Sequence, residues 1–332
     1  MKVIVTGVAG FIGFHVAQAL AAGGHDVVGV DNLVPYYPLV LKRARLAALP
    51  KAIRFVEADV ADAARFSGLV REVKPQAMVH LAAQAGVRYS IDNPFAYIHS
   101  NDLGHVSVLE ALRRDAPEAH LVYASSSSVY GDRDRAPFKE DDRADLPSSL
   151  YAATKRANEL ASSAYAHLYG LRQLGLRFFT VYGRWGRPDM AYWSFTDAIL
   201  AGREIELFGH GQGLRDFTHV RDVVGSIMAM VEAPLFPAGE LPHRIYNIGN
   251  ASPVRVTELV ALIEQAAGRK AKTRMLEAQP GDVPLTSADT SRVRADYGFA
   301  PATPLADGVA DFVGWFRERP ELHGLTPQPH LV

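Results

Sequence analysis

Short apolar runs alternate with amphipathic segments along the first half of the chain. The runs have the composition of parallel strands that are covered on both faces, and they comprise residues 3–5, 26–30, 77–83 and 119–124. Residues 53–59 alternate between apolar and polar positions like a half-buried strand. Helical spacing of apolar residues fills the intervals, so the pattern predicts an α/β fold in which strands and helices follow one another in turn.

A glycine-rich turn follows the first predicted strand. Gly7, Gly10 and Gly13 have the spacing Gly-x-x-Gly-x-x-Gly and open a helix that continues with apolar residues. Glycines at such a turn let backbone N–H groups approach a pyrophosphate at the positive end of the helix. The second strand ends on Asp31, where an acidic residue holds the ribose hydroxyls of NAD and repels the 2′-phosphate of NADP. The sequence therefore predicts a Rossmann-type, doubly wound parallel sheet that binds NAD.

Later strand ends supply further candidate cofactor contacts. Asp59 is placed either to accept a hydrogen bond from the adenine amino group or to cap the helix that follows Ala61. Asn101 precedes a predicted helix and is either its N-cap or an amide that faces the cofactor. The remaining predicted contacts with NAD lie beside these strand ends: Phe11, Ile12, Asn32, Val60, Leu81, Ala82 and Ala83.

Composition and charge narrow the class of protein. The 332 residues are enough for one large α/β domain and a smaller lobe. The 35 Lys and Arg residues almost balance the 36 Asp and Glu residues, which indicates neither a nucleic acid nor a membrane surface as partner. The chain has no cysteine, so disulfides, thiolate metal sites and cysteine nucleophiles are excluded. It begins on a predicted core strand, which leaves no room for a signal peptide, and we expect a cytoplasmic protein.

The predicted elements divide the chain into two lobes. Residues 1–177 are expected to form the NAD-binding lobe, and residues 220–250 are expected to return to it. Residues 178–219 and 251–332 are expected to form a smaller, C-terminal substrate-binding lobe. The active site is expected between the lobes, where pockets are usual.

A tyrosine and a lysine four residues apart carry the candidate chemistry. Tyr151 and Lys155 open a predicted helix and share one of its faces. The lysine cation, together with a positively charged nicotinamide ring, favours the phenolate and is expected to lower the pKa of Tyr151 from its usual value of about 10. Such a tyrosine can act as a general base near neutral pH. A run of serines, 125–128, ends the strand before this helix.

These motifs resemble those of a known family. Thr6-Gly7-x-x-Gly10-x-x-Gly13, Ser126 and Tyr151-x-x-x-Lys155 are similar to the extended short-chain dehydrogenase/reductase family, in its branch of NAD-dependent nucleotide-sugar epimerases and dehydratases. The resemblance continues over segments 31–37, 85–90, 177–183, 186–190, 215–218, 246–250 and 279–284. Within that branch it implies an enzyme that interconverts UDP-glucuronate and UDP-galacturonate.

The resemblance also implies roles for the catalytic residues. Tyr151 takes the proton from the sugar 4-hydroxyl while hydride passes from C4 to NAD, Lys155 holds the nicotinamide ribose, and Ser126 and Ser128 hydrogen-bond the reacting oxygen. The keto sugar then rotates and takes hydride back on its other face. Dehydratases of the branch carry an Asp-Glu pair where this chain has Ser127 and Ser128, and decarboxylases carry a glutamate at the second position. Neither dehydration nor decarboxylation is therefore expected.

Cations and one hydroxyl are the candidate substrate contacts. A C6 carboxylate next to a C4 ketone is lost easily as CO₂ unless its orientation is fixed, and the guanidinium of Arg187 can hold it in a fork of hydrogen bonds. Thr180 can add a hydroxyl donor where galactose-type relatives have asparagine. The resemblance places Arg215 near the UDP phosphates or ribose, whereas Arg88 is either an anion binder or a surface charge. Asp282 either contacts the uridine ribose or only shapes a turn.

Other residues and other functions complete the expectations. Arg184 is expected to face solvent, and His80 is expected to be a hydrogen-bonded core histidine. The rival functions are UDP-glucuronate decarboxylation, 4-epimerisation of a neutral UDP-hexose, and NAD sensing by a binding protein without turnover. The family implies a homodimer that pairs through helices such as the one beginning at Tyr151.

Overall fold

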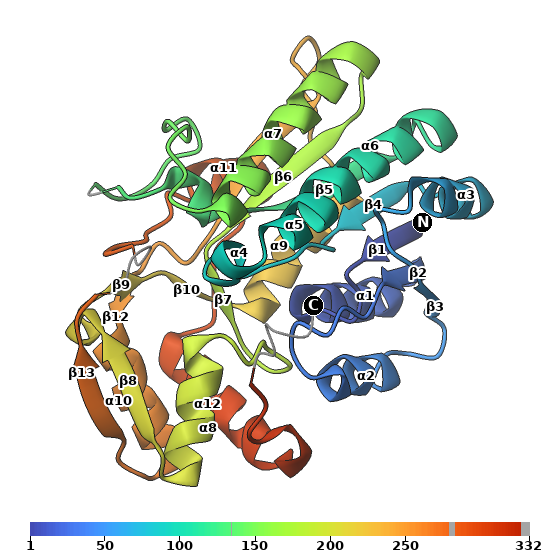
Figure 1. The fold of residues 1–332 in the computed structure, drawn as a ribbon. Helices are drawn as coiled ribbons and strands as arrows, with labels where there is room; N and C mark the ends of the chain where they lie inside the picture. The colour runs from blue at the N-terminus through green and yellow to red at the C-terminus, as the bar shows by residue number, and fades with distance from the viewer. Residues whose placement is uncertain (134, 279–282, 327–332) are drawn as a thin grey trace.

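A parallel sheet forms the centre of the computed structural model, which describes residues 1–133, 135–278 and 283–326. Its seven strands have the order β11-β6-β5-β4-β1-β2-β3, and every neighbouring pair is parallel (Figure 1). They are β1 (Lys2–Thr6), β2 (Asp26–Asp31), β3 (Arg54–Glu57), β4 (Ala77–His80), β5 (His120–Ser126), β6 (Gln173–Phe178) and β11 (His243–Ile248). The chain winds outward in both directions from β1, which confirms the predicted doubly wound sheet.

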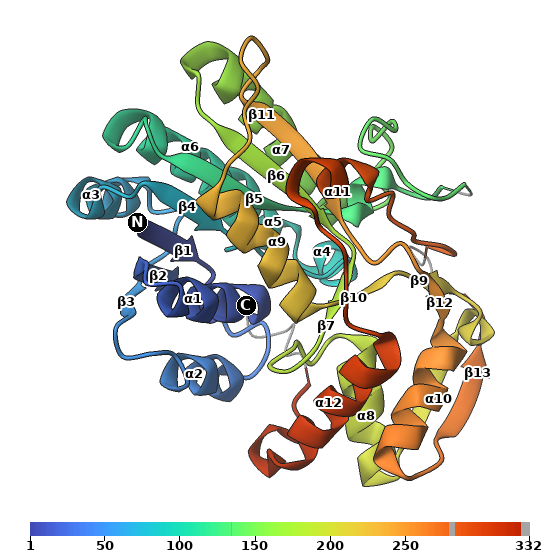
Figure 2. The same ribbon diagram turned by 180° about the vertical axis from the view of Figure 1, so that it is seen from behind.

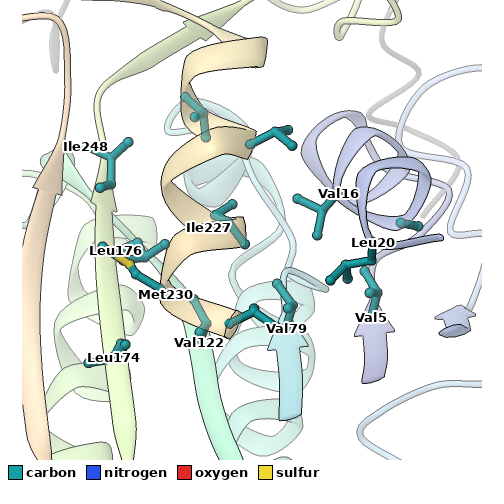
Figure 3. Close-up of a cluster of buried hydrophobic side chains, with 14 of the residues drawn as sticks. Val5, Val16, Leu20, Val79, Val122, Leu174, Leu176, Ile227, Met230 and Ile248 are labelled. Atoms are coloured by element: carbon teal, nitrogen blue, oxygen red, sulfur yellow. The ribbon is translucent and has the colours of Figure 1, made fainter. Parts of the chain in front are cut away.

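Helices cover both faces of this sheet because successive strand residues point to opposite sides. Val3 and Val5 of β1 belong to the cluster that packs against α1 and α9, whereas Ile4 belongs to the cluster under α3, α6 and α7. Figure 3 shows Val5 between the strands and the residues of α1 and α9. The helices are α1 (Phe11–Ala22), α9 (Val220–Glu232), α3 (Ala63–Val73), α6 (Gly104–Asp115) and α7 (Leu150–Tyr169).

The predicted strand at residues 77–83 is shorter in the structure. β4 ends at His80, and the next backbone N–H groups turn back to β1: Leu81 N–H donates to the carbonyl of Thr6 at 3.2 Å, and Ala82 N–H donates to its hydroxyl at 3.2 Å. The apolar run therefore continues into the loop at the edge of the sheet, where small side chains leave room for a ligand.

A smaller group of elements packs beside the carboxyl edge of the sheet (Figure 2). Its helices α8, α10 and α12 share one apolar cluster with β8, which pairs in parallel with β13. The elements are β7 (Thr180–Tyr182), α8 (Ala191–Ala201), β8 (Glu204–Phe208), β9 (Leu214–Arg215), β10 (Phe217–His219), β12 (Val254–Arg255), α10 (Val256–Ala267), β13 (Lys272–Leu276) and α12 (Leu305–Arg317).

Two segments bear on the predicted lobe boundaries, which stay a prediction. β11 pairs with β6 at the edge of the main sheet, and α9 packs on that sheet, so residues 220–250 include elements of the main body. α11 (Ser291–Tyr297), which lies in the stretch assigned to the smaller lobe, also packs against β11 and α9.

Short helices and turns complete the description. They are α2 (Leu39–Ala47), α4 (Tyr89–Asp92), α5 (Pro94–Tyr97), a π-helix (Ile98–Leu103) and 3₁₀ turns at Ser127–Tyr130, Gly209–Gly211 and Pro320–Leu322. Within the described ranges, every helix is too short or too polar to span a membrane.

Candidate functional site

One cavity opens over the carboxyl ends of the central strands. Most of the residues predicted to contact the cofactor line it: Gly7, Gly10, Phe11, Ile12, Gly13, Asp31, Asn32, Asp59, Val60, Leu81, Ala82, Ala83, Tyr151 and Lys155. Ser126 and Arg187 line the same cavity. The structure thus brings segments from seven parts of the chain together at the topological switch point, where open α/β sheets bind their ligands.

The glycine turn has a backbone that other residues would not allow. Gly7 has a φ of +73°, and a Cβ on Gly13 would collide with the carbonyl oxygen of Gly7. The helix that follows, α1, begins at Phe11 without a side-chain cap, so its first N–H groups point toward the cavity mouth. A cradle of this kind fits the pyrophosphate of a dinucleotide.

Asp31 is held rigidly at the end of β2. Its Oδ2 accepts from Ala9 N–H at 3.1 Å, and its Oδ1 accepts from Leu33 N–H at 2.9 Å and from Lys42 Nζ at 3.2 Å. Lys42 is a partner that the sequence pattern did not reveal. Because its ammonium offsets part of the carboxylate charge, the preference for NAD would depend on the fixed acceptor geometry as well as on repulsion.

Asp59 does not cap the helix that follows it, so that alternative is wrong. α3 begins at Ala63, and the side chain of Asp62 accepts from Arg65 N–H at 3.1 Å. Asp59 instead accepts from Ala61 N–H at 2.8 Å and from the Asn32 amide at 3.1 Å, at the cavity wall. A contact with the adenine stays a prediction.

Asn101 is not an N-cap either. It lies inside the π-helix in a helical run that begins before it, and its side chain is buried. Its amide accepts from Gln84 N–H at 2.8 Å and donates to the Gln84 carbonyl at 3.1 Å and to Thr154 Oγ1 at 3.0 Å. Asn101 therefore joins the loop after β4 to α7, and its predicted contact with the cofactor stays untested.

Tyr151, Lys155 and Ser126 meet at the cavity wall. α7 begins before Tyr151 because Ser149 Oγ accepts from Ala152 N–H at 3.1 Å. Lys155 Nζ donates to the Ala124 carbonyl of β5 at 2.9 Å, which fixes the ammonium beside the end of that strand.

The serine run has two separate connections. Ser126 Oγ donates to Ser128 Oγ at 3.0 Å and accepts from Ser128 N–H at 3.2 Å, in the 3₁₀ turn that also contains Ser127. Ser125 points the other way and donates to Glu159 Oε1 at 2.6 Å. Ser127 and Ser128 are partly exposed beside the cavity.

In the protein without a cofactor, the pKa of Tyr151 is raised above its usual value. Burial raises the pKa of the phenol, while the hydrogen bond to Ser126 and the charge of Arg187 act in the opposite direction. Burial also lowers the pKa of Lys155, to about 8. The predicted lowering of the tyrosine pKa is therefore not a property of the protein alone, and it requires the positive charge of a bound nicotinamide ring.

A buried ion pair supports this corner of the site. Arg177 of β6 and Glu159 of α7 form two hydrogen bonds of 2.8 Å each, directly behind Ser125. The hydrogen bonds to Arg177 and Ser125 lower the pKa of Glu159 although burial opposes them, so the carboxylate is charged. The sequence pattern gave no signal of this pair because its members lie on different elements.

Arg187 is oriented by an acidic neighbour that sequence reasoning missed. Its Nε donates to Asp189 Oδ1 at 3.0 Å, and its Nη2 forms an ion pair with the same carboxylate. Burial opposes the charge of Arg187, but Asp189 raises its pKa overall. Tyr36, also on the cavity wall, donates to Asp189 Oδ2 at 3.3 Å. Adjacent opposite charges in the 186–190 motif are the signal that could have indicated this pair.

Of the other predicted substrate residues that the structure describes, Arg88, Thr180 and Arg215 are not among those that line the cavity. The Arg88 guanidinium lies over the ring of Phe208, 5.2 Å from its centroid, and so faces the smaller group of elements. Thr180 begins β7, and Arg215 of β9 donates to the carbonyl of Leu214 at 3.0 Å. Asp282 lies outside the described residues. Their roles toward a substrate stay predictions.

Asp216 is a buried carboxylate within the motif that contains Arg215. It accepts from the N–H groups of Asn250 at 2.7 Å, Ala251 at 3.0 Å and Ala288 at 2.8 Å. Three loops beside the site are thus fixed by one side chain, so the motif has a structural role that the sequence analysis did not assign.

The structural roles expected of Arg184 and His80 are confirmed. The side chain of Arg184 is about half exposed, and its Nε donates to Asp311 of α12 at 2.8 Å. His80 is buried, and its Nδ1 is 2.7 Å from Thr6 Oγ1. Burial lowers the pKa of His80 to about 3, so the ring is neutral and is not a proton donor at neutral pH.

A parallel sheet with a glycine turn, an acidic strand end and a Tyr–Lys pair around one cavity defines a nucleotide-dependent enzyme of the short-chain dehydrogenase/reductase type. The comparison with family models gives the particular family. The chain belongs to the NAD-dependent epimerase/dehydratase family, whose model matches residues 3–249. This confirms the expected resemblance and NAD as the cofactor.

Individual relatives are similar over nearly the whole chain. A protein from Rhizobium meliloti named probable UDP-glucuronate 4-epimerase is 44% identical and covers 95% of this chain and 97% of its own length. UDP-glucuronate 4-epimerase 2 from Arabidopsis thaliana is 44% identical over 95% of this chain and 76% of its own length. The solved structure of UDP-glucuronic acid 4-epimerase from Bacillus cereus, in complex with UDP-glucuronic acid and NAD, has a TM-score of 0.89 at 30% identity and covers 96% of this chain and 99% of that one.

Proposed function

We propose that this chain is a UDP-glucuronate 4-epimerase, which interconverts UDP-glucuronate and UDP-galacturonate. The observation that carries the proposal is the position of Arg187 on the wall of the cavity that also contains Tyr151 and Ser126. A guanidinium at this place suits a sugar carboxylate. Ser127 and Ser128 stand where elimination or decarboxylation would need carboxyl groups. The names of the relatives agree with this substrate.

Each residue of the proposed site has its own role in the reaction. Tyr151 accepts the proton of the sugar 4-hydroxyl and gives it back after the sugar has turned, and Ser126 holds the same oxygen by a hydrogen bond. Lys155 positions the cofactor ribose and supplies positive charge near the phenolate. When bound, NAD would supply the acceptor and donor of the C4 hydride. Arg187 keeps the C5–C6 bond away from the alignment in which a β-keto acid loses CO₂.

A product assay tests the proposal. Purified protein with NAD is incubated with UDP-glucuronate, and the nucleotide sugars and CO₂ are measured. UDP-galacturonate without CO₂ supports the proposal, whereas UDP-xylose would show a decarboxylase. Turnover of UDP-glucose or UDP-galactose but not of the acidic sugar would show a neutral 4-epimerase.

Tyr151→Phe tests the assigned base and separates an enzyme from a sensor. The phenol is replaced by a ring of the same shape, so NAD affinity should stay within about twofold. Loss of a general base should lower kcat by about 10²–10⁴-fold. Epimerisation at the wild-type rate would refute the role of Tyr151, and a wild-type protein that binds NAD without any turnover would be a sensing protein.

A homodimer is part of the proposal. The continuous helical run from α5 to α6 exposes apolar side chains three to eight positions apart, and α7, which packs against it, exposes Leu160. The exposed fractions are 82% for Phe95, 49% for Leu103, 38% for Val106 and 56% for Leu160. Figure 1 shows these helices side by side on one face of the sheet. Exposed apolar side chains grouped on neighbouring helices favour association with a second copy. The cytoplasmic location stays a prediction.

A further inference from the structure

Three consecutive carbonyl groups immediately before Arg187 are held by side chains from the cofactor-binding half of the molecule. His15 of α1 lies 2.8 Å from the carbonyl of Arg184 through its Nε2. Arg45 of α2 donates to the carbonyl of Trp185 from Nε at 3.0 Å and from Nη2 at 2.7 Å, and to the carbonyl of Gly186 at 2.6 Å. The loop that presents Arg187 is thus clamped along its backbone.

The same guanidinium reaches the glycine turn. Arg45 Nη1 donates to the carbonyl of Ala9 at 2.8 Å and to the hydroxyl of Tyr37 at 2.7 Å. Ala9 lies between Gly7 and Gly10, in the turn that fits the pyrophosphate. Each N–H group of Arg45 therefore has an acceptor, and one side chain joins the cofactor turn to the loop of Arg187.

Burial makes this connection rigid. Arg45 is fully buried, and its acceptors are carbonyl and hydroxyl oxygens, with the Tyr37 ring 5.4 Å from the guanidinium carbon. A buried cation stabilised only by such dipoles is costly to displace, since each lost hydrogen bond would leave a charged group without compensation in a medium of low dielectric. A planar fork with five N–H groups fits these oxygens, and an ammonium does not.

The loop itself would not keep its path without this support. Trp185 has a φ of +60°, a backbone conformation that residues other than glycine rarely adopt. A Cβ on Gly186 would collide with the Tyr192 hydroxyl, so the chain passes close to α8 at the next position. Strained backbone persists where the surroundings over-determine it, and the carbonyl of Trp185 is the group that Arg45 holds twice.

We propose that Arg45 is a positioning residue that makes the glycine turn and the Arg187 loop a single mechanical unit. Ordering of the turn by NAD then also orders the loop that holds the sugar acid. The part of this inference that concerns the acid rests on the proposed function. The part that concerns the backbone does not.

The test compares Arg45→Lys with Arg43→Lys, a matched change at an exposed position of the same helix. Hydrogen exchange of residues 183–190 is measured with and without NAD, in the absence of sugar. Wild type and Arg43→Lys should show slower exchange in this loop when NAD is added. Arg45→Lys should show at least about tenfold faster exchange there and little response to NAD, because the carbonyl clamp is lost.

Binding and product distribution give the second readout. The Kd for UDP-glucuronate should rise about tenfold in Arg45→Lys, while the Kd for UDP should stay within about twofold, and the share of turnovers that release CO₂ should increase. A variant that is only less stable would contain less active protein, but the ratio of its Kd values for UDP-glucuronate and UDP and its share of CO₂-releasing turnovers would not change. Exchange and affinity ratios equal to those of Arg43→Lys would overturn the proposal.

Tyr37→Phe keeps the inference testable if Arg45→Lys does not fold. This change removes one acceptor of Arg45 and leaves the ring in place, so smaller shifts in the same direction are expected. Unchanged loop exchange in this variant would count against the proposal. If wild type does not convert UDP-glucuronate, the proposed function fails, while the exchange measurements still decide the role of Arg45.

Discussion

At the scale of single residues, burial disfavours the charged forms of both Tyr151 and Lys155. It raises the pKa of the phenol and lowers that of the ammonium, so each group is driven toward its neutral form. The catalytic state needs the opposite for both. For Tyr151 the charge of Arg187, and that of the nicotinamide ring when the cofactor is bound, favour the phenolate, whereas Asp102 and Glu159 raise the pKa of Lys155 and favour its ammonium.

The pKa of Lys155 predicts a pH dependence of cofactor binding. The amine is protonated below about 8 and loses its charge above that value in the free protein. If the charged form binds the ribose, NAD affinity should fall roughly tenfold between about pH 7 and pH 9. Equilibrium binding of NAD at several pH values checks this. Lys155→Met should bind NAD weakly with no step in this range, and an equal step in that variant would assign the titration to another group.

Arg187 is the residue on which the preference for the acidic sugar depends. In Arg187→Ala the carboxylate loses a charged, forked partner, so kcat/KM for UDP-glucuronate should fall about 10- to 100-fold. The fraction of CO₂ among the products should rise, because the C5–C6 bond is no longer held. Both are measured in one assay with a carboxyl-labelled substrate. Unchanged selectivity together with an unchanged product ratio would remove Arg187 from the carboxylate site.

At the scale of elements, the pair Arg177 and Glu159, together with Ser125, joins the ends of β5 and β6 to the middle of α7. The two side chains are 2% and 1% exposed, so breaking the pair leaves the buried Glu159 carboxylate to its second, partly exposed partner Arg156. Arg177→Met should lower the free energy of unfolding by about 3–5 kcal/mol. Urea unfolding measures this loss. Arg172→Met changes a partly exposed arginine just before β6 and should lower the free energy of unfolding by no more than about 1 kcal/mol. An equal loss in both variants would contradict the role assigned to Arg177.

Patterns within single elements allowed the frame of the site to be predicted. Apolar runs located the strands, and residues just after them, such as Asp31 and Asp59, lie at the cavity because parallel strands end at one edge. The sequence leaves the cap of α3 open as one of two alternatives for Asp59, because Asp59 and Asp62 are both suited to it by residue type, and in the structure Asp62 is the cap. Only the hydrogen-bonding geometry distinguishes them.

Contacts between distant segments were not accessible to sequence reasoning. Arg45 is one of several basic residues on a short helix, and its acceptors on the loop before Arg187 are 140 and 141 positions away. Asp31 is the last residue of β2, whereas Arg88 lies in a longer segment after the end of β4 at His80, and its guanidinium lies over Phe208. Sequence spacing specifies which residues leave a strand together, and tertiary packing decides where longer loops carry them.

At the scale of the whole molecule, the exposed side chains of Phe95, Leu103, Val106 and Leu160 lie on the helical run from α5 to α6 and on α7, which cover one face of the sheet. Phe95→Lys should weaken the proposed dimer, because a charge would be buried at the centre of the contact. Light scattering with size-exclusion chromatography at several concentrations should show a monomer or a faster-dissociating dimer. Met275→Lys, at an exposed apolar position of β13, should leave the mass unchanged. A dimer of equal stability in both variants would place the interface elsewhere.

The position of Tyr151 along α7 has one more consequence. The tyrosine lies in the first turn of a helix of 20 residues that begins at Leu150, so its oxygen is near the end where the peptide dipoles add up to a partial positive charge. This partial charge comes from the backbone and does not titrate with pH. It would continue to favour the phenolate at alkaline pH after the ammonium of Lys155 has been neutralised, and in Lys155→Met it would sustain a residual rate.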